Sequence, residues 1–255
     1  MTFRRLFARE RVLGTLVVVA ASMACIRLGI WQLDRLAQRR AFNHHVAAAR
    51  EMPPLGLPWD GDLAGQEYRA VRVVGAYDFE KQVAVRNQFY GGQPGFHLIT
   101  PLLVGSGDSV NRSEPEAVLI DRGWIPATDN EKSSDWRKYD EPGSVAVTGV
   151  VRLGGPAPSL AGLAEPTPIA EQGAADFWTS IDINRIERQI GYSLLPVYVE
   201  KSPATASERL PIATVPVLDL TEGPHLGYAI QWFGFATLLM VGYPLYLGKR
   251  EARRT

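Results

Sequence analysis

The stretch VLGTLVVVAASMACIRLGIWQL at residues 12–33 and its counterpart YAIQWFGFATLLMVGYPLYL at residues 228–247 decide the fold. A helix needs about 20 mainly apolar residues to cross the hydrocarbon core of a bilayer, so each stretch is long enough to do so. The residues between them contain no third stretch of this kind. The sequence therefore predicts a membrane protein in which two terminal transmembrane helices flank a central domain at residues 34–227.

Basic residues lie on the outer side of both apolar stretches: Arg4, Arg5, Arg9 and Arg11 before the first, and Lys249, Arg250, Arg253 and Arg254 after the second. Lys and Arg near the ends of a span favour the cytoplasmic side of the membrane. We therefore expect residues 1–11 and 248–255 in the cytoplasm and an extracytoplasmic central domain. The segment before the first stretch has no room for a transit peptide, which favours a bacterial plasma (inner) membrane over a mitochondrial one.

The charge distribution argues against a nucleic-acid partner. The formal net charge of the chain is zero, but residues 34–248 hold 18 basic and 25 acidic residues, a net charge of −7. Affinity for phosphates comes from clustered Lys and Arg, so an acidic domain is a poor nucleic-acid binder. About 200 residues are enough for one well-buried core, and the sequence requires no second domain.

Cys25 is the only cysteine, so the chain has neither a disulfide framework nor paired metal-ligand spacing. Its context, Ser22-Met-Ala-Cys25, loosely resembles a lipoprotein signal peptide that is cleaved before a lipidated cysteine. Hydrophobicity continues to Leu33, however, and Ser22 stands where an aliphatic residue is usual, so we expect a retained helix. Cys25 also belongs to a small-residue stripe with Ala21 and Gly29, which lets another helix, here the second span, approach closely.

Arg27 is an ionisable residue inside the first apolar stretch. Such residues are costly in a membrane and often functional. One interpretation is that Arg27 lies near the outer end of the span and extends to the headgroups. Trp31 and Arg35 follow at helical spacing, as is typical of a membrane interface. The other interpretation is that Arg27 binds a specific anionic partner.

The central part of the chain reads mostly as strands, because polar and apolar residues alternate, as in Tyr68–Val74. Further strands are expected at 82–86, 97–104, 117–124, 144–153, 177–181 and 197–200, with a turn-like segment at 77–81. Segments with Gly and Pro separate them at 91–95, 141–143 and 154–158. The sequence predicts a β-rich, α+β domain that is barrel- or sandwich-like.

Two helical segments are expected in addition. Ile183–Ile190 is amphipathic, with Asp182 as an N-terminal cap and Gly191 as a stop. The first span is expected to continue as a helix from Leu36 to Arg50. Ala157–Gly173 and Lys201–Pro216 are expected to be loops.

Sequence motifs for catalysis are nearly absent. Four histidines, His44, His45, His97 and His225, are scattered, without a zinc-binding His-Glu-x-x-His helix, a phosphate-binding glycine loop or a nucleophile elbow. We expect His44 and His45 on a solvated helix and His97 as a hydrogen-bonded residue of a strand. These observations predict a protein that is not an enzyme and has no structural metal.

The block Asp121-Arg122-Gly123-Trp124 admits two interpretations. Asp121 beside Arg122 suggests an acidic catalyst in a cleft. The favoured interpretation is a structural corner at the end of an apolar strand, where Gly123 permits a tight bend. Trp124 would then cover the end of the core, and Arg122 would brace the corner through its several donors.

His225 stands directly before the second apolar stretch, so its imidazole is expected at the outer membrane surface. Ala229, Trp232 and Ala236 follow it at helical spacing and share its face. An imidazole beside a tryptophan in this position suits the axial ligation of a flat, membrane-soluble cofactor such as haem. The alternative is an interfacial histidine hydrogen-bonded to the domain above.

These residues carry a resemblance to a known family. GIWQLDR at 29–35, VLIDRGWIP at 118–126 and HLGYAIQWFGFA at 225–236 resemble the N-terminal, central and C-terminal motifs of the surfeit locus protein family of cytochrome oxidase assembly factors. QPGFHLITP at 93–101, VTGVVR at 147–152 and LLPVY at 194–198 also occur in the family's order. The resemblance covers essentially the whole chain. One departure is Asp121, which stands where Asn is common.

The resemblance implies an assembly factor for a haem–copper terminal oxidase, which assists the insertion of haem a into subunit I or stabilises that subunit. It implies a contact between haem a and His225, with Trp232 nearby, and no cofactor needed for folding. Expected partners are subunit I, the haem synthesis or insertion machinery and the membrane. Together with Arg27, the residues expected to contact partners or support the fold are Trp31, Gln32, Arg35, Arg122, Gly123, Trp124 and Tyr228.

Two other functions remain open at this point. One is an accessory protein of the respiratory oxidase that binds no cofactor, which an inaccessible His225 would favour. The other is a membrane-anchored enzyme with an acidic cleft at Asp121 and Arg122, which a perturbed carboxyl pKa in a deep pocket would favour.

Overall fold

The computed structural model describes residues 11–59, 61–104, 116–156, 175–203, 209–214 and 218–253. The chain divides into a helical unit, residues 1–45 and 219–255, and a barrel unit, residues 46–218. Several predicted features lie outside the described residues: Arg4, Arg5, Arg9, Arg254 and the expected loop Ala157–Gly173.

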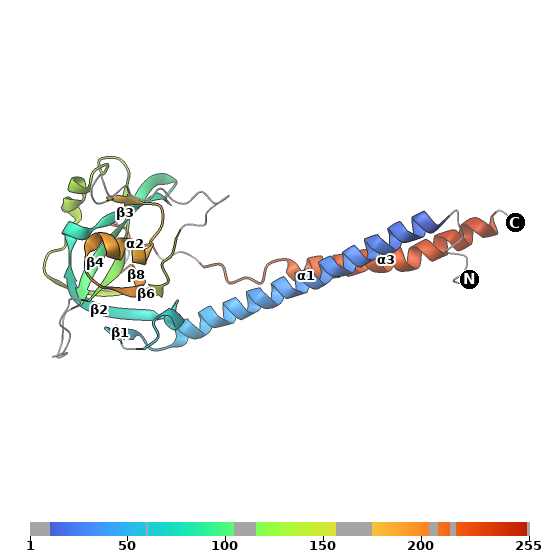
Figure 1. The fold of residues 1–255 in the computed structure, drawn as a ribbon, viewed down its shortest axis with the longest axis horizontal. Coiled ribbons are helices and arrows are strands. Elements are labelled where there is room, and N and C mark those ends of the chain that lie inside the picture. The colour runs from blue at the N-terminus through green and yellow to red at the C-terminus, as the bar shows by residue number, and fades with distance from the viewer. Residues whose placement is uncertain are drawn as a thin grey trace. The chain divides into compact units, whose positions relative to one another are not determined.

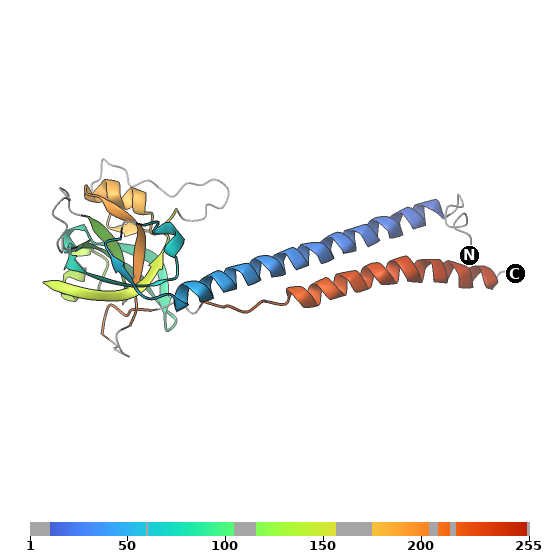
Figure 2. The ribbon, with the colours of Figure 1, turned by 90° about the horizontal axis from the view of Figure 1, so that it is seen from below.

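The two long helices are α1 (Val12–Glu51) and α3 (His225–Ala252), which Figures 1 and 2 show side by side. The most apolar 18-residue segments of α1 and α3 have mean hydropathies of 2.0 and 1.3, so both helices are long and apolar enough to cross a membrane. α1 continues without a break to Glu51, which confirms the expected helix beyond the first apolar stretch. The limits 12–33 and 228–247 of the two spans stay predictions.

The two helices pack antiparallel through one face of each. The first residue of α3 contacts the middle of α1, and Tyr243 near the end of α3 contacts Thr15 near the start of α1. Buried α1 positions recur at intervals of seven: Thr15, Ser22, Gly29 and Leu36. Ala229 and Ala236 are buried on α3 at the same interval. A seven-residue repeat is typical of helix pairs with a left-handed twist.

Gly29 is a point of close approach between the helices. A Cβ atom at this position would lie 2.7 Å from the ring of Phe233 on α3. The approach of the second span to the small-residue stripe is therefore confirmed at Gly29. Towards the start of α1 the buried residue is Ser22 rather than Ala21, because positions seven apart stay on the contact face and positions eight apart rotate away from it.

The barrel unit is a closed barrel of five strands. Around the barrel the order is β2 (Ala70–Tyr77), β6 (Ser144–Arg152), β8 (Leu194–Lys201), β5 (Ala117–Pro126), β4 (Gln93–Val104) and β2 again. Only the pair β5–β8 is parallel in this circuit. Of the two predicted architectures, barrel and sandwich, the structure is thus a barrel. Closure leaves these five strands without a free edge.

Three strands extend the barrel sheet at its sides. β1 (Leu55–Leu57) pairs with β2, β3 (Val83–Tyr90) pairs with β4, and β7 (Phe177–Trp178) pairs with β3. The expected strand at 177–181 is shortened to two residues. The expected break at 91–95 is too long, because only Gly91 and Gly92 turn the chain and Gln93 already belongs to β4.

The barrel strands bury apolar residues on both faces. One cluster fills the interior and includes Val73, Leu102, Ile120 and Val199. A second cluster lies on the outer face of β3, β4, β5 and β8 and is covered by α2 (Ile183–Ile190) and Trp178. This explains why β5 is a continuous apolar run instead of an alternating one.

α2 has the limits and caps that the sequence predicts. Its buried residues Ile183, Ile186 and Ile190 share one face. The Asp182 side chain accepts a hydrogen bond from the Arg185 backbone N–H, and Gly191 ends the helix with a left-handed φ of 85°. Of the second expected loop, residues 201–203 and 209–214 are described, and Ile212 forms a backbone bridge with Trp124.

Candidate functional site

The start of α3 is fixed to α1 by polar side chains. Arg40 binds Glu222 through two hydrogen bonds of 2.8 and 2.9 Å. Arg39 donates to the backbone carbonyl oxygens of Asp219 and Thr221, and Asn43 donates to that of Leu220. Sequence reasoning missed these residues, although their spacing of three to four residues along α1 is a helical-face signal. They hold the segment immediately before His225 against α1.

His225 contacts α1 through its Nδ1 atom. Nδ1 lies 2.8 Å from the side-chain oxygen of Gln32. Because an amide oxygen only accepts, Nδ1 carries the hydrogen of this bond. In a neutral imidazole the lone pair is then on Nε2, which is the form that ligates metals. The structure therefore brings together two residues that the sequence singled out in separate motifs.

A glycine lies next to Nε2 of His225. A Cβ atom at Gly223 would lie 3.6 Å from His225 Nε2, and Gly223 has a left-handed φ of 69° that favours glycine. His225 itself is half-buried. The imidazole thus presents one engaged and one unengaged nitrogen among the described residues, which is the arrangement of a ligand held by a supporting hydrogen bond.

The predicted face of α3 is divided between packing and exposure. Ala229 and Ala236 are buried, and Trp232 is half-buried and packs edge to face on Phe235 with ring centroids 5.9 Å apart. Tyr228 is 49% exposed. The face that carries His225 is therefore mainly the contact with α1.

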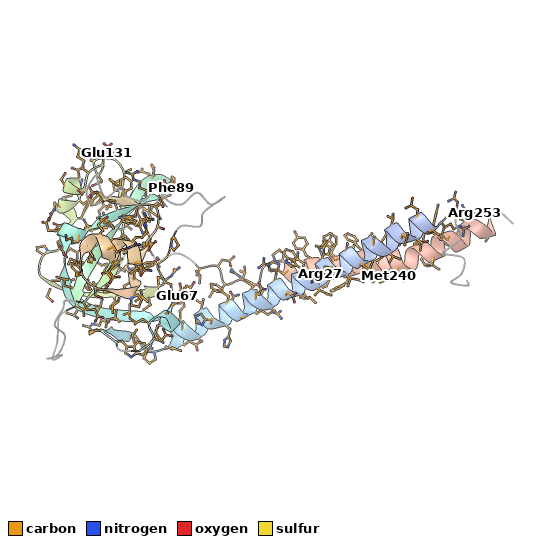
Figure 3. The ribbon with its side chains drawn as sticks, viewed as in Figure 1. Arg27, Glu67, Phe89, Glu131, Met240 and Arg253 are labelled. Atoms are coloured by element: carbon orange, nitrogen blue, oxygen red, sulfur yellow. The ribbon has the colours of Figure 1, made fainter. Side chains whose placement is uncertain are left out.

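Arg27, Trp31 and Arg35 are exposed on α1. Arg35 stacks over the Trp31 ring at 5.6 Å and donates to Gln38. Arg27, labelled in Figure 3, has no hydrogen bond or ion pair with any described residue. Headgroup contact and an anionic partner both need this exposure, and both interpretations of Arg27 stay predictions.

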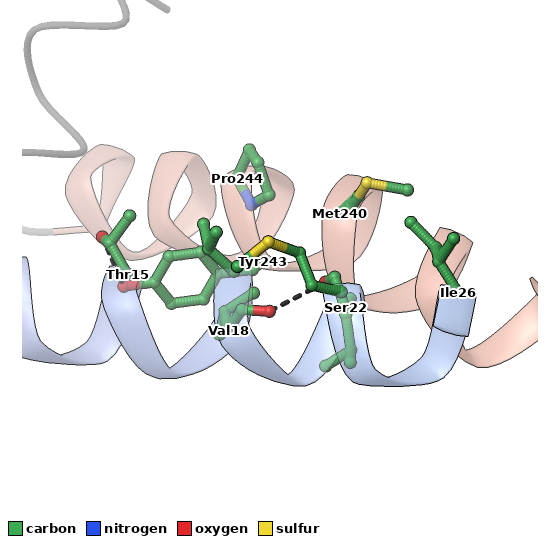
Figure 4. A pocket seen from close by; sticks show the side chains of 10 residues that line it. Thr15, Val18, Ser22, Ile26, Met240, Tyr243 and Pro244 are labelled. Atoms are coloured by element: carbon green, nitrogen blue, oxygen red, sulfur yellow. Dashed lines mark hydrogen bonds between the residues drawn. The ribbon is translucent and has the colours of Figure 1, made fainter. Parts of the chain in front are cut away.

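An apolar cavity of about 320 Å³ lies between α1 and α3, nearer the start of α1 (Figure 4). Its lining is Thr15, Val18, Val19, Ser22, Met23, Ile26, Leu239, Met240, Tyr243 and Pro244. The Thr15 and Tyr243 hydroxyls lie 3.3 Å apart, and the Ser22 hydroxyl donates to the Val18 carbonyl oxygen. The cavity therefore offers a hydrocarbon surface with its few polar groups already paired.

The block Asp121-Arg122-Gly123-Trp124 is a bulge inside β5, and its interpretation as a strand end is wrong. Leu98 pairs with Gly123 and Ile99 pairs with Asp121, so Arg122 is an extra residue without a partner on β4. β5 continues to Pro126 because the bulge absorbs the irregularity. Gly123 has a φ of 119°, and a Cβ there would lie 2.2 Å from the Ile212 carbonyl oxygen. Only glycine fits this position.

Arg122 is a fully buried cation with several fixed acceptors. Its guanidinium donates to the Gln82 side chain, the Tyr139 carbonyl oxygen and Glu141, the last at 3.0 Å. It also lies over the rings of Tyr77 and Phe79, at 5.0 and 5.1 Å. A buried charge needs such partners to offset its lost hydration. Partial burial tends to raise the pKa of Glu141, but the hydrogen bond from Arg122 and the charge of Lys201 lower it overall.

Trp124 packs inside the barrel unit and is 5% exposed. Its ring lies 5.5 Å from that of Tyr90, and a Cβ at Gly95 would lie 2.3 Å from Trp124 Nε1. The backbone of Trp124 exchanges two hydrogen bonds of 2.8 Å with Ile212. Both Arg122 and Trp124 therefore make contacts within the barrel unit that support the fold.

Asp121 pairs with His97, not with Arg122. Its two carboxylate oxygens lie 3.0 and 2.8 Å from His97 Nδ1, and the Gly123 backbone N–H donates to Oδ1. Burial alone would lower the pKa of His97, but the hydrogen bond and charge of Asp121, with the charge of Glu200, raise it overall. Sequence reasoning missed this pair because it joins different strands, while Arg122 is only the neighbour along the chain.

Comparisons with known proteins identify the family. The SURF1 family model matches residues 19–237 of the chain. A SURF1-like protein of Mycobacterium bovis is 28% identical over 250 residues, which cover 94% of this chain and 84% of the relative. Surfeit locus protein 1 of Arabidopsis thaliana is 25% identical over 258 residues, which cover 82% of this chain and 70% of the relative. A SURF1-like protein of Rickettsia conorii is 24% identical over 229 residues, which cover 87% and 85%. The chain therefore belongs to the SURF1 family.

Proposed function

We propose that this protein assists the assembly of a haem–copper terminal oxidase by sheltering haem a at its helix pair before or during insertion into subunit I. The SURF1 family is known for cytochrome oxidase assembly factors, which are generally non-enzymatic, and this supports the broader part of the proposal. The proposed partners are subunit I and the machinery that makes or inserts haem.

The observation that carries the haem proposal is the geometry of His225. Gln32 holds Nδ1, and Gly223, which has no side chain, lies next to Nε2. Bound haem a would supply an iron that accepts a nitrogen ligand, and Nε2 is the nitrogen that this chain offers. Trp232, two turns into α3, offers a half-buried aromatic surface near the same end of the helix.

The helix pair also offers shelter for apolar groups. The cavity between α1 and α3 is lined at its near end by Ile26, which lies six residues, or about 9 Å along a helix, from Gln32 on α1, and by Leu239, which lies 14 residues beyond His225 on α3. Its apolar lining suits a hydrocarbon substituent of a membrane-soluble cofactor. Shelter is needed because a free, largely apolar macrocycle leaves water for any apolar phase or aggregates.

The proposed orientation has both termini in the cytoplasm and the barrel unit outside the plasma membrane. Arg11 precedes α1 and Lys249 and Arg250 end α3, so the antiparallel pair carries these basic residues at the same end. In a Cys25→Ser background, a new cysteine at the exposed Ser134 should react with an impermeant reagent in intact cells. Labelling of a new cysteine at Thr255, but not of one at Ser134, would show that the orientation is the opposite of the proposed one.

An absorption spectrum tests the haem proposal directly. The full-length protein, purified in detergent from cells that synthesise haem a, should show a Soret band and an α band. His225→Ala should lose most of this absorbance, while His44→Ala, an exposed histidine of α1, should keep it. Equal haem content in the two variants would exclude His225 as the ligand. A colourless wild-type protein that still supports oxidase assembly would favour the accessory role without a cofactor.

A further inference from the structure

A second, polar cavity lies in the barrel unit on the outer face of the sheet. Its volume is about 270 Å³, and its lining includes His97, Asp121, Arg152, Ser180, Tyr198 and Glu200. Val85 and Ile181 add apolar surface. None of these residues takes part in the proposed haem site, and the cavity lies wholly within the barrel unit.

The register of β4, β5 and β8 brings ionisable groups together. Leu119 and Asp121 lie on one face of β5, two residues apart, and pair with Tyr198 and Glu200 on the parallel strand β8. On β4, His97 is two residues from Ile99, which pairs with Asp121. The outer face is thus apolar at one level, under α2, and ionisable at the next. This is a built pocket, formed where the apolar layer ends.

Two carboxylates, Asp121 and Glu200, line the pocket, and Glu67, an ion-pair partner of Arg152, adds a third carboxylate outside the lining. Arg152 lies between Glu200, at 3.3 Å, and Glu67, at 3.5 Å, while His97 neutralises only Asp121. These five groups carry a net charge of −1 when His97 is protonated and −2 when it is neutral. An excess negative charge that is largely removed from water is costly unless a proton or another cation joins it. Burial raises the pKa of the Glu200 carboxyl overall, although the positive charges of Arg152 and His97 lower it, and the charge of Asp121 adds to the rise.

Three oxygen atoms of the pocket lack donors among the described residues. The Ser180 hydroxyl oxygen is buried without a hydrogen-bond partner. Arg152 donates only to Oε2 of Glu200, which leaves Oε1 without a donor from the described residues. The Tyr198 hydroxyl, whose pKa burial raises to about 12, has no partner there either. A primary ammonium group has three N–H donors and one positive charge.

We propose that this pocket binds a primary ammonium group, carried by a free alkylamine or by a lysine side chain of a partner protein. The charge offsets the excess carboxylate, its donors satisfy the open oxygens, and Val85 and Ile181 contact the alkyl chain. Three His, Asp or Glu side chains arranged to hold a metal ion are not found among the described residues, so an organic cation suits the site better than a metal. The proposal is independent of haem binding.

Calorimetric titration of the detergent-solubilised full-length protein with n-butylammonium chloride tests the proposal. We expect saturable binding that n-butanol and tetramethylammonium do not reproduce, because the first lacks the charge and the second lacks N–H donors. Affinity should rise with pH as Glu200 and His97 lose their protons, with proton release on binding, because the cation favours the more negative form of the pocket. Absence of saturable binding, or equal binding of n-butanol, would overturn the proposal.

Single substitutions test whether the ammonium group binds in this pocket. Glu200→Gln keeps the shape and removes the charge, and should weaken binding about tenfold or more, the scale of one lost charged hydrogen bond. Ser180→Ala should weaken it about threefold, as expected for one neutral hydrogen bond. Glu131→Gln removes an exposed carboxylate elsewhere and should bind like the wild type. Unchanged affinity in Glu200→Gln and Ser180→Ala, with near-ultraviolet circular dichroism unchanged, would place binding elsewhere and contradict the assignment.

A lysine derivative with both backbone ends blocked distinguishes the two possible sources of the ammonium group. If Nα-acetyl-lysine methylamide binds at least as tightly as n-butylammonium, the mouth of the pocket accepts a peptide-linked side chain, and a partner lysine is the ligand. If only the free amine binds, the ligand is a small alkylamine. Both results support an ammonium site.

Discussion

Each unit contains a histidine that is held through Nδ1, His225 in the helical unit and His97 in the barrel unit, but their acceptors differ. In the helical unit His225 donates to the neutral oxygen of Gln32, while in the barrel unit His97 faces the carboxylate of Asp121. The amide fixes the ring without adding charge and leaves the lone pair on Nε2. The carboxylate favours the imidazolium, in which Nε2 is a donor. Similar residues therefore make a candidate ligand in one unit and a charged, hydrogen-bonding group in the other.

The largest expected effect is the loss of Trp124 from the barrel unit. Trp124→Ala removes a buried ring that packs on Tyr90 and Gly95, and should lower the free energy of unfolding by about 3–5 kcal/mol. Protein abundance in the membrane should fall, and oxidase defects should follow that loss. An abundant, stable Trp124→Ala protein that fails to support oxidase assembly would instead assign Trp124 to a functional surface.

A smaller effect is expected in the helical unit at Gly29. Gly29→Val places atoms into the Phe233 ring and should separate α1 from α3, at a cost of about 1–3 kcal/mol. The bound-haem absorbance should fall because Gln32 no longer reaches His225, while near-ultraviolet circular dichroism of the barrel unit should persist. Gly234→Ala, where a Cβ meets nothing within 4 Å, is the control. Equal haem loss in both variants would argue against helix packing as the cause.

The smallest effect is a pH dependence carried by His97. Because its pKa is raised in the folded state, its stabilising contribution is complete below the unfolded pKa of about 6.5 and is lost as pH rises through the folded value. Thermal unfolding between pH 6 and 9 should show a fall in melting temperature that His97→Gln lacks. The same slope in both proteins would assign the dependence to other groups.

Local signals in the sequence predict local structure well. The cap at Asp182, the isoleucine spacing and the stop at Gly191 define α2 completely, since all three act within one short segment. The alternation of residues finds the longer strands for the same reason. β1 has only three residues, which is too short for an alternating pattern to be recognised. It is a strand because it pairs with β2, whose residues lie outside any local sequence window around β1.

The sites are harder to predict because they depend on register between strands and helices. Asp121 and Arg122 are neighbours in sequence, yet the bulge sends them to different partners, His97 and Glu141. Gln32 and His225 were each found in a motif, but their hydrogen bond spans 193 positions and needs the antiparallel helix pair. Residue types were therefore predictable, and their combinations were not.

The most direct measurement is the haem a content of subunit I in membranes from a strain that lacks this protein and has no paralogue. Subunit synthesis should continue, while haem-loaded oxidase should fall. Wild-type protein and His44→Ala should restore it, and His225→Ala, present at equal abundance, should not. Normal oxidase spectra in the deletion strain would contradict the assembly role, and full restoration by His225→Ala would contradict the haem contact.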